Sequence, residues 1–428
     1  MQPILNAIAA FFGWINTLGP TVILPIALFL IGLAFRVKAG EAFVNALKVG
    51  IGFFGLTVMI GVVAENLGPV AQGIVERTGL QLAIPDVGVG LHIPITFAPP
   101  YAAFVIPLGI LVNMAMLLLG LTKTVDIDVW NFWSWMFSWA LVDYITGSPL
   151  LGFLAFVATG VVSLILGDLQ AKYIQEGYDL PGITFPHPFS TFWGIFAWPF
   201  NWVFDRIPGL KDLQADTETL QKRLGPLGDS TVLGLIFGIV LALLAGYSWV
   251  KTLQFGVVVA AILLLMPMMI KILVSGLFPI SEAARALLTR RFPGREYYIG
   301  LDCAVGVAQP PSLVVGIILI PITLLLAFIL PGNRLMPLAD LAFLAFWVST
   351  AMPMLRNNII RGVLFGTCMM AISLWMATSI APLVTTLGVQ AGFAVPEGTE
   401  YVSCLTIYPW SWLWAFIAAL FKGGFGAF

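Results

Sequence analysis

Two aspartates lie where apolar sequence is interrupted by small residues. Asp86 occurs in the run PDVGVG and Asp302 in the run LDCAVG. Each run is followed by a proline pair that opens a long apolar segment, Pro99-Pro100 in the first case and Pro310-Pro311 in the second. Inside a membrane, broken backbone of this kind is tolerated only where it is buried in protein or lines a wet cavity. Two such breaks in corresponding halves indicate a transporter's binding site, the alternative being two loops outside the membrane.

Ionisable groups at membrane depth are functional candidates, because burying them there is costly. Asp302 is the strongest, and together with the amide of Gln309 its carboxylate can bind vicinal hydroxyls of a polyol. The alternative for Asp302 is a helix-capping role. Asp86 is the second candidate for substrate binding, and capping is equally open there. His92 is either a polar group lining the site or an outward-facing loop residue.

His187 stands between two prolines in the run FPHP. An imidazole has a usual pKa of about 6.5, so His187 can donate to a sugar hydroxyl or act as a catalytic base that accepts its proton. The alternative is a structural histidine. Asn131, Ser134 and Ser138 are spaced three to four residues apart and share one helical face beside Trp130. This pattern is typical of a sugar site with an aromatic wall, and equally of a polar stripe between packed helices.

Several classes of function are excluded or left without support. The net charge is −1 and no basic stripe is present, so no nucleic-acid partner is expected. Two histidines cannot form a histidine-rich metal centre, and the three cysteines, Cys303, Cys368 and Cys404, form no CxxC pair. The sequence lacks the motifs of serine hydrolases, P-loop proteins and zinc proteases. No metal or cofactor is therefore expected.

Composition predicts the elements that position these residues. Hydrophobic residues make up 60% of the chain and charged residues 10%, against roughly 25% charged in soluble domains. The mean hydropathy is +0.99, and apolar runs long enough to span a bilayer recur. We expect an all-α polytopic membrane protein with about eleven transmembrane helices and two re-entrant hairpins at the aspartates. The expected spans are 20–36, 43–64, 101–122, 129–146, 149–167, 230–248, 252–274, 312–330, 338–355, 359–380 and 408–421.

The distribution of basic residues predicts the orientation. With the N-terminus outside and the C-terminus cytoplasmic, 17 of the 20 lysines and arginines face the cytoplasm. Only Arg77, Lys251 and Arg334 face outward in that arrangement. Because cytoplasmic loops carry the excess of basic residues, the opposite orientation is disfavoured.

Four landmarks recur in the same order along the chain. Leu18-Gly19-Pro20 matches a sequence 206 residues later, and the proline pairs lie 211 apart. Asp86 and Asp302 are separated by 216 residues, and Asp128 and Asp340 by 212. Each half holds five expected spans, an odd number, so the second half should be inverted relative to the first. The two hairpins would then enter from opposite sides and meet near the midplane.

The repeat predicts four regions. Residues 1–167 form the first repeat, with scaffold spans, an outer hairpin and core spans, and residues 230–380 form the second, with an inner hairpin. Residues 168–229 form a cytoplasmic linker in which the aromatic segment 189–204 is expected to lie at the membrane interface. Residues 381–428 form a C-terminal loop and the last span.

Six motifs occur along the chain in one order: Leu18-Gly19-Pro20-Thr21-Val22-Ile23-Leu24-Pro25, Gly50-Ile51-Gly52-Phe53, Val125-Asp126-Ile127-Asp128-Val129-Trp130-Asn131, Lys222-Arg223-Leu224-Gly225-Pro226, Ile299-Gly300-Leu301-Asp302 and Leu330-Pro331-Gly332-Asn333. Together they resemble the galactitol-type IIC components of the bacterial phosphotransferase system, in the ascorbate–galactitol superfamily. The similarity runs from about Thr17 to Leu383.

The resemblance implies an elevator-type transporter in which the first two spans of each repeat form a dimerising scaffold and the remainder a moving core. It implies substrate binding by Asp302, by Asn131 or Ser134, and by His187. The phosphoryl group would come from a phosphocysteine on a separate IIB protein, supplied by IIA. This chain would be the translocation subunit rather than the carrier of the phosphoryl group.

We therefore expect a homodimeric permease subunit in a bacterial inner membrane that moves a polyol or sugar such as galactitol inward for phosphorylation. The alternative is a secondary transporter of the same fold that is coupled to an ion and releases unmodified substrate. A membrane-embedded enzyme without transport is a third, weaker possibility. Phosphorylated product, free sugar or neither inside vesicles separates the three.

Overall fold

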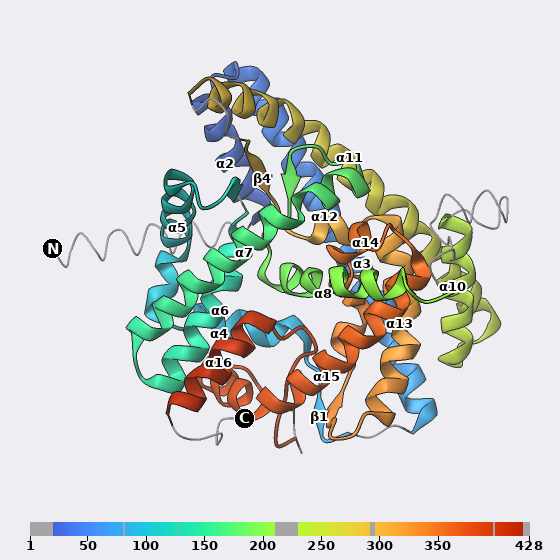
Figure 1. The fold of residues 1–428 in the computed structure, drawn as a ribbon. Helices are drawn as coiled ribbons and strands as arrows, with labels where there is room; N and C mark the ends of the chain where they lie inside the picture. Colours follow the sequence, from blue (N-terminus) through green and yellow to red (C-terminus); the bar gives the residue numbers. More distant parts are fainter. Residues whose placement is uncertain are drawn as a thin grey trace.

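The computed structural model describes residues 20–79, 82–126, 128–209, 230–291, 296–396 and 399–422, and helices form most of it (Figure 1). The segment 211–223 and the side chains of the segment 285–295 lie outside the described residues. Among the described helices, three are long and apolar enough to cross a membrane: α7 (Pro149–Tyr178), α13 (Pro310–Ile329) and α15 (Ile359–Gln390). Shorter apolar helices accompany them. The chain is thus a helical membrane protein, while the number of eleven spans stays a prediction.

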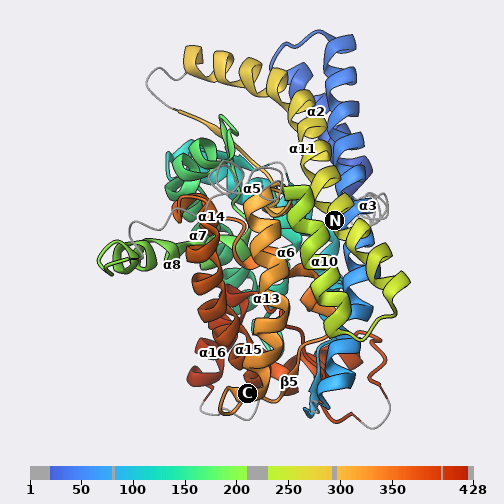
Figure 2. The ribbon, with the colours of Figure 1, turned by 90° about the vertical axis from the view of Figure 1, so that its right-hand side faces the viewer.

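Four helices form two hairpins that lie side by side at one edge of the molecule (Figure 2). They are α2 (Pro20–Ala34), α3 (Ala39–Thr78), α10 (Ser230–Leu244) and α11 (Trp249–Arg291). The 40 residues of α3 span about 60 Å, twice the roughly 30 Å of a bilayer's hydrocarbon core. Accordingly, α3 and α11 rise beyond the other helices in Figure 2.

Glycines allow α3 and α11 to approach closely. A methyl group at Gly52 of α3 would lie 2.5 Å from the backbone nitrogen of Leu273, and one at Gly276 of α11 would lie 2.3 Å from the carbonyl oxygen of Asn45. Small residues at such crossings permit close backbone packing within a membrane. The glycines of α3 differ in this respect, because a methyl group at Gly61 would meet nothing within 4 Å.

The chain between these hairpins begins with broken elements and continues with longer helices. They are β1 (Ile84–Pro85), η1 (Gly88–Leu91), α4 (His92–Phe97), η2 (Pro100–Phe104), α5 (Val105–Leu119), β2 (Thr124–Asp126), α6 (Val129–Thr146), α7, β3 (Ile183–Thr184) and α8 (Pro188–Phe204). The bounds of α6 agree with the predicted span. Its start follows from Asp128, whose side chain accepts the backbone N–H of Trp130 as an N-cap.

The chain after α11 follows a similar order of elements: a strand, a short helix, a long helix, a second strand and then further helices. They are β4 (Tyr298–Gly300), α12 (Ala304–Val307), α13, β5 (Leu335–Met336), η4 (Ala339–Trp347), α14 (Ala351–Met354), α15 and α16 (Pro409–Phe421). Both α8 and α16 begin with a proline, which suits the first helical position because its missing N–H would have no partner there.

Short parallel strands hold each aspartate stretch against the other half of the chain. β4, which precedes Asp302, lies between β2 and β3. β1, which precedes Asp86, pairs with β5, and Asp86 itself forms a bridge with Ser403. Each aspartate is therefore positioned by residues that are distant in the sequence.

The predicted span 338–355 is wrong as one continuous helix. It consists of the 3₁₀ helix η4 and the four-residue helix α14, with a turn between them. The segment begins inside the protein, because the backbone N–H groups of Leu338 and Asp340 both bind the Asp86 carboxylate. Pro353 then supplies no N–H donor to α14. Four other helices, α3, α7, α11 and α15, are longer than predicted.

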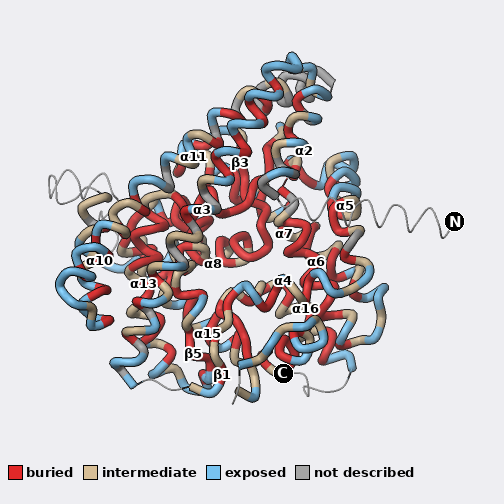
Figure 3. Tube along the Cα trace, turned by 180° about the vertical axis from the view of Figure 1, so that it is seen from behind, coloured by how far each residue is buried: buried red, intermediate tan, exposed pale blue. Residues whose placement is uncertain are grey.

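Exposed residues lie on the outer helices, whereas buried residues concentrate inside (Figure 3). Many of the exposed residues on these helices are apolar. Leu118 on α5 is 71% exposed and Phe328 on α13 is 70% exposed. Exposed apolar surface of this kind fits contact with lipid. α8 differs from the expected interfacial helix, because Phe189 and Trp193 in its first half are buried, while Trp202 near its end is exposed.

Candidate functional site

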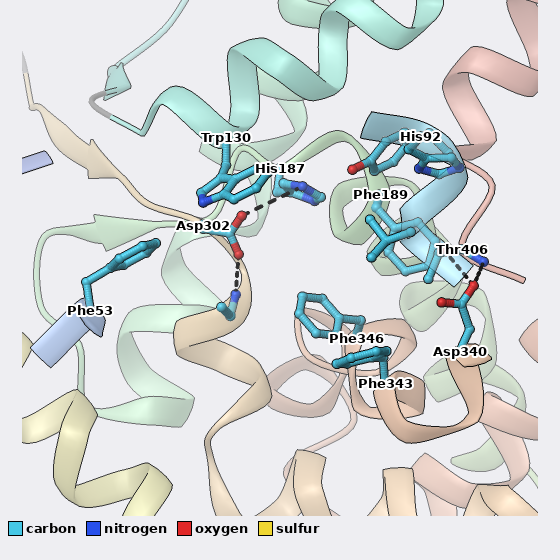
Figure 4. Close-up of a pocket in the computed structure, with 13 residues that line it drawn as sticks. Phe53, His92, Trp130, His187, Phe189, Asp302, Asp340, Phe343, Phe346 and Thr406 are labelled. Atoms are coloured by element: carbon cyan, nitrogen blue, oxygen red, sulfur yellow. Dashed lines mark hydrogen bonds and ion pairs between the residues drawn. The ribbon is translucent and has the colours of Figure 1, made fainter. Parts of the chain in front are cut away.

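A cavity of about 260 Å³ lies among the broken elements of both halves (Figure 4). Its walls come from Phe53, Val89, His92, Trp130, His187, Phe189, Asp302, Ala304, Asp340, Phe343, Phe346, Thr406 and Tyr408. Polar groups thus meet mostly aromatic surface, the arrangement typical of a site for a small polar molecule.

One polar end of the cavity is formed by Asp302 and His187 (Figure 4). β4 delivers Asp302, whose Oδ1 accepts the backbone N–H of Ala304 at 2.6 Å. Its backbone N–H donates to Asp128 Oδ2 at 3.0 Å, which fixes the turn after the strand. Asp302 Oδ2 lies 3.8 Å from His187 Nε2, too far for a hydrogen bond and suited to an ion pair only when the imidazole is protonated.

His187 occupies the residue before the first turn of α8 and is 6% exposed. Its Nε2 lies 3.2 Å from Ser134 Oγ, and Ser134 in turn donates to the backbone carbonyl of Trp130 at 2.9 Å. Within the described part of the chain, His187 Nδ1 is buried and has no hydrogen-bond partner. One ring edge of His187 is therefore oriented by Ser134 and Asp302, and the other keeps a free hydrogen-bonding position.

The second polar end is formed by Asp340 and Thr406 (Figure 4). Asp340 Oδ2 accepts the backbone N–H of Thr406 at 2.8 Å and its hydroxyl at 2.7 Å. The backbone N–H of Asp340 donates to Asp86 Oδ2 at 2.9 Å. Asp340 thus stands at the start of η4 with its side chain held by Thr406 and its backbone held by Asp86.

His92 contributes a third polar group to the wall. Its Nε2 lies 2.9 Å from Cys404 Sγ, and its ring packs between Phe137 at 4.3 Å and Tyr408 at 4.8 Å between centroids. Tyr408 also faces His187, at 5.8 Å between centroids. The rings of both histidines therefore pack against the same tyrosine.

The predicted site residues separate into wall residues and supporting residues. Asp302, His187 and His92 line the cavity, whereas Ser134 lies behind His187 as its hydrogen-bond partner. Asn131 is fully buried and donates to Asp126 Oδ1 at 2.9 Å.

Gln309 and Asp86 are not among the lining residues. Gln309 is the residue before the first turn of α13 and is partly exposed. Asp86 lies behind the wall, where its carboxylate accepts backbone N–H groups. The position of Asp86 therefore favours the capping alternative over direct contact with a ligand.

Several wall residues were not predicted. The sequence marks Asp340 only through its spacing of 212 residues from Asp128, and that spacing is a usable signal. Thr406 and Tyr408 belong to the region after residue 384, for which no motif was found. Phe343 and Phe346 lie in the segment expected to be an ordinary span. Among the described residues, no group of three or more histidine, cysteine or acidic side chains is arranged to hold a metal ion.

These features define the class of the protein: a helical membrane protein that encloses a polar and aromatic cavity among broken segments. The profile of the family described as "PTS system sugar-specific permease component" matches residues 14–398. The chain therefore belongs to this family, and the resemblance predicted from the six motifs is confirmed.

Two relatives from Escherichia coli (strain K12) extend the comparison. The "PTS system galactitol-specific EIIC component" is 37% identical over 379 residues, which cover 89% of this chain and 84% of the relative. The "Putative permease IIC component" is 36% identical over 403 residues, which cover 94% of this chain and 92% of the relative. Because both alignments leave out only short stretches at the ends of this chain, they include the segments from β1 to η4 that surround the cavity.

Proposed function

We propose that this chain is the membrane-embedded IIC subunit of a phosphotransferase system and takes up a polyol or sugar such as galactitol. The observation that carries the proposal is the enclosed cavity, in which Asp302 and His187 meet aromatic walls. The substrate class is supported by the name of the galactitol-specific relative. A polyol offers hydroxyl donors for the carboxylate and C–H faces for Trp130 and Phe189.

In this proposal, one hydroxyl of the substrate donates to Asp302 Oδ2, and a second, attacking hydroxyl lies beside His187. The attacking oxygen bonds to the phosphorus of a phosphocysteine on a separate IIB protein, the S–P bond breaks so that the cysteine leaves as a thiolate, and the imidazole accepts the proton of the attacking hydroxyl. The 3.8 Å separation of Asp302 and His187 supports a shared contact with one substrate. Two of the chain's cysteines, Cys303 and Cys404, are buried, which agrees with a donor cysteine on another protein.

We further propose an inverted repeat and an elevator mechanism. The recurring order of elements after α3 and after α11 supports the repeat. The paired α3 and α11 would form the scaffold of a homodimer, and the segments around the cavity would form the moving core. Phe53 of α3 is the single lining residue contributed by the described parts of α2, α3, α10 and α11, so most of the site could move with the core.

The proposed orientation has the N-terminus outside and the C-terminus in the cytoplasm of a bacterial inner membrane. The turn between α2 and α3 carries Arg36 and Lys38, which would then face the cytoplasm together with the end of α11. That face would receive IIB, while substrate would enter from the opposite side.

Reconstituted vesicles test the function. Purified protein is inserted into vesicles with phosphorylated IIB on the cytoplasmic face of the subunit and labelled galactitol on the other. Phosphorylated product on the IIB side is expected, and IIB lacking its cysteine serves as the control. Free galactitol that accumulates equally with both IIB forms would instead indicate a secondary transporter. Absence of both binding and uptake would contradict the proposed substrate class.

A further inference from the structure

We infer that Asp340 forms a second substrate subsite at the end of the cavity opposite Asp302, where it binds hydroxyl groups at the far end of an acyclic polyol. The inference rests on the proposed function and adds a specificity-determining residue to it. Thr406 and Asp86 act on this subsite as positioning residues.

The first observation is the bonding of the Asp340 side chain. It is fully buried, and its Oδ2 accepts both donors of Thr406. Its Oδ1 has no hydrogen-bond partner among the described residues. A buried carboxylate oxygen without a donor is unfavourable. This oxygen is therefore free to accept a donor from a ligand.

The second observation is the position of Asp340 relative to Asp302. The two carboxylates lie on opposite sides of one cavity, with Phe343, Phe346 and Phe189 drawn between or beneath them (Figure 4). Both are therefore available to a single ligand. An extended polyol has hydroxyl donors at both ends and C–H groups between them, which matches two acceptor ends separated by aromatic surface.

The third observation is the way in which the subsite is fixed. Asp86 accepts the backbone N–H groups of Leu338 and Asp340, so the start of η4 is attached to the first half of the chain. Thr406 comes from the segment before α16 and holds the Asp340 carboxylate. A subsite held by three distant segments is suited to discriminate between ligands by length.

Asp86 also supplies the competing explanation. Its carboxyl is a close neighbour of the Asp340 carboxyl, so one proton shared between the two acids would satisfy Oδ1 without a ligand. Asparagine at position 340 separates these explanations. Its amide can donate to Asp86 as a shared proton would, but it presents altered hydrogen bonding to a ligand hydroxyl.

The test measures the affinity of purified full-length protein for galactitol and for erythritol, an alditol two carbons shorter, which we expect to contact only one end. Asp340→Asn should weaken galactitol binding by about 10-fold or more, since hydrogen bonds to charged groups contribute about 1.5–3 kcal/mol. Erythritol binding should stay within about 2-fold, so the ratio of the two affinities falls. Asp143→Asn is the matched control, because Asp143 binds the Tyr101 hydroxyl away from the cavity wall.

Thr406→Val provides a second variant if Asp340→Asn does not fold. It removes the hydroxyl donor to Asp340 and keeps the backbone donor, so a smaller loss of galactitol affinity is expected, again without a loss for erythritol. Unchanged galactitol affinity in Asp340→Asn, or equal losses for both ligands in the folded variant, would overturn the inference. Wild-type protein that binds neither alditol would overturn the proposed function and the inference with it.

Discussion

The two aspartate stretches share a local structure but differ in what their carboxylates contact. In both, the carboxylate accepts the backbone N–H two residues later, from Ala304 at 2.6 Å and from Gly88 at 3.0 Å. Both follow a short strand held by the other half of the chain. Asp302 nevertheless faces His187 across the cavity, whereas Asp86 accepts four backbone N–H groups, from Gly88, Leu338, Asp340 and Leu405.

The partner aspartates show the reverse arrangement. Asp128 supports Asp302 from behind by accepting its backbone N–H, and it also caps α6. Asp340, which follows the strand in the matching place, lies on the cavity wall and is itself supported by Asp86. In one cluster the cavity is faced by Asp302, which follows the first strand of its half, and in the other by Asp340, which follows the second strand. Asp128 and Asp340 each accept two hydrogen bonds, so it is their position relative to the cavity that separates an acid of the wall from a supporting acid.

The largest effect is expected for Asp86→Ala. It leaves four backbone N–H groups without their acceptor, each at about 1–3 kcal/mol when buried, so the free energy of unfolding should fall by several kcal/mol. Thermal unfolding of purified protein in detergent measures the change. A variant as stable as the wild type would show that Asp86 does not support the fold through these four hydrogen bonds.

The next largest effect is expected for His187→Ala, since only the Asp302 cluster places a histidine next to its acid. Phosphorylation with phospho-IIB should fall by about 10²–10⁴, the usual contribution of a general base, whereas substrate affinity falls much less. The phosphorylation rate is measured with saturating phospho-IIB, and the substrate affinity is measured separately without it. Equal losses in both would limit His187 to binding, and no loss in either would make it structural. His92→Ala is the matched comparison, with binding and phosphorylation expected to fall together.

Asp302→Asn should weaken substrate binding by at least about 10-fold, because a charged hydrogen-bond acceptor on the cavity wall is lost. Stability should change little, since the asparagine oxygen can still accept the N–H of Ala304. Calorimetry with galactitol and thermal unfolding check the two statements. Asp302→Asn is thus expected to lower affinity and leave stability nearly unchanged, whereas Asp86→Ala is expected to lower stability. The two variants together test whether Asp302 faces the substrate while Asp86 supports the fold. Unchanged affinity would remove Asp302 from the binding site.

The sequence predicted the class, the family and the two aspartate stretches, because hydrophobic composition and short motifs are local properties. It also predicted the bounds of α6, where Asp128 provides a recognisable N-cap. The span 338–355 was wrong because its apolar composition does not distinguish an α-helix from a 3₁₀ helix followed by a turn. The extension of α3 and α11 beyond the membrane thickness was missed for a related reason, since their ends are less apolar than their centres.

The roles of individual acids were beyond reach of the sequence. The donors that saturate Asp86 include the N–H groups of Asp340 and Leu405, which lie 254 and 319 residues away. No local pattern records such contacts. The spacing between Asp128 and Asp340 did show that the two are related, but it could not show which of them faces the cavity. Thr406 and Tyr408 belong to a stretch without a recognised motif, so the structure was needed to find them.

The smallest effect is expected for Asp128→Asn, which alters support without touching the cavity wall. The two Asp128 oxygens accept the N–H groups of Trp130 and Asp302, both at 3.0 Å. An asparagine retains one acceptor, so one of these two hydrogen bonds is lost and the turn that carries Asp302 is held less firmly. Substrate affinity should fall by a few-fold, because a typical hydrogen bond contributes about 0.5–1.5 kcal/mol.

Calorimetry with galactitol measures the affinity of Asp128→Asn. The control is Asp168→Asn, which perturbs a carboxylate bound to Thr122 and Thr124 away from the wall. A loss as large as that of Asp302→Asn would place Asp128 in direct contact with the substrate and end the distinction between facing and supporting acids in this half of the cavity.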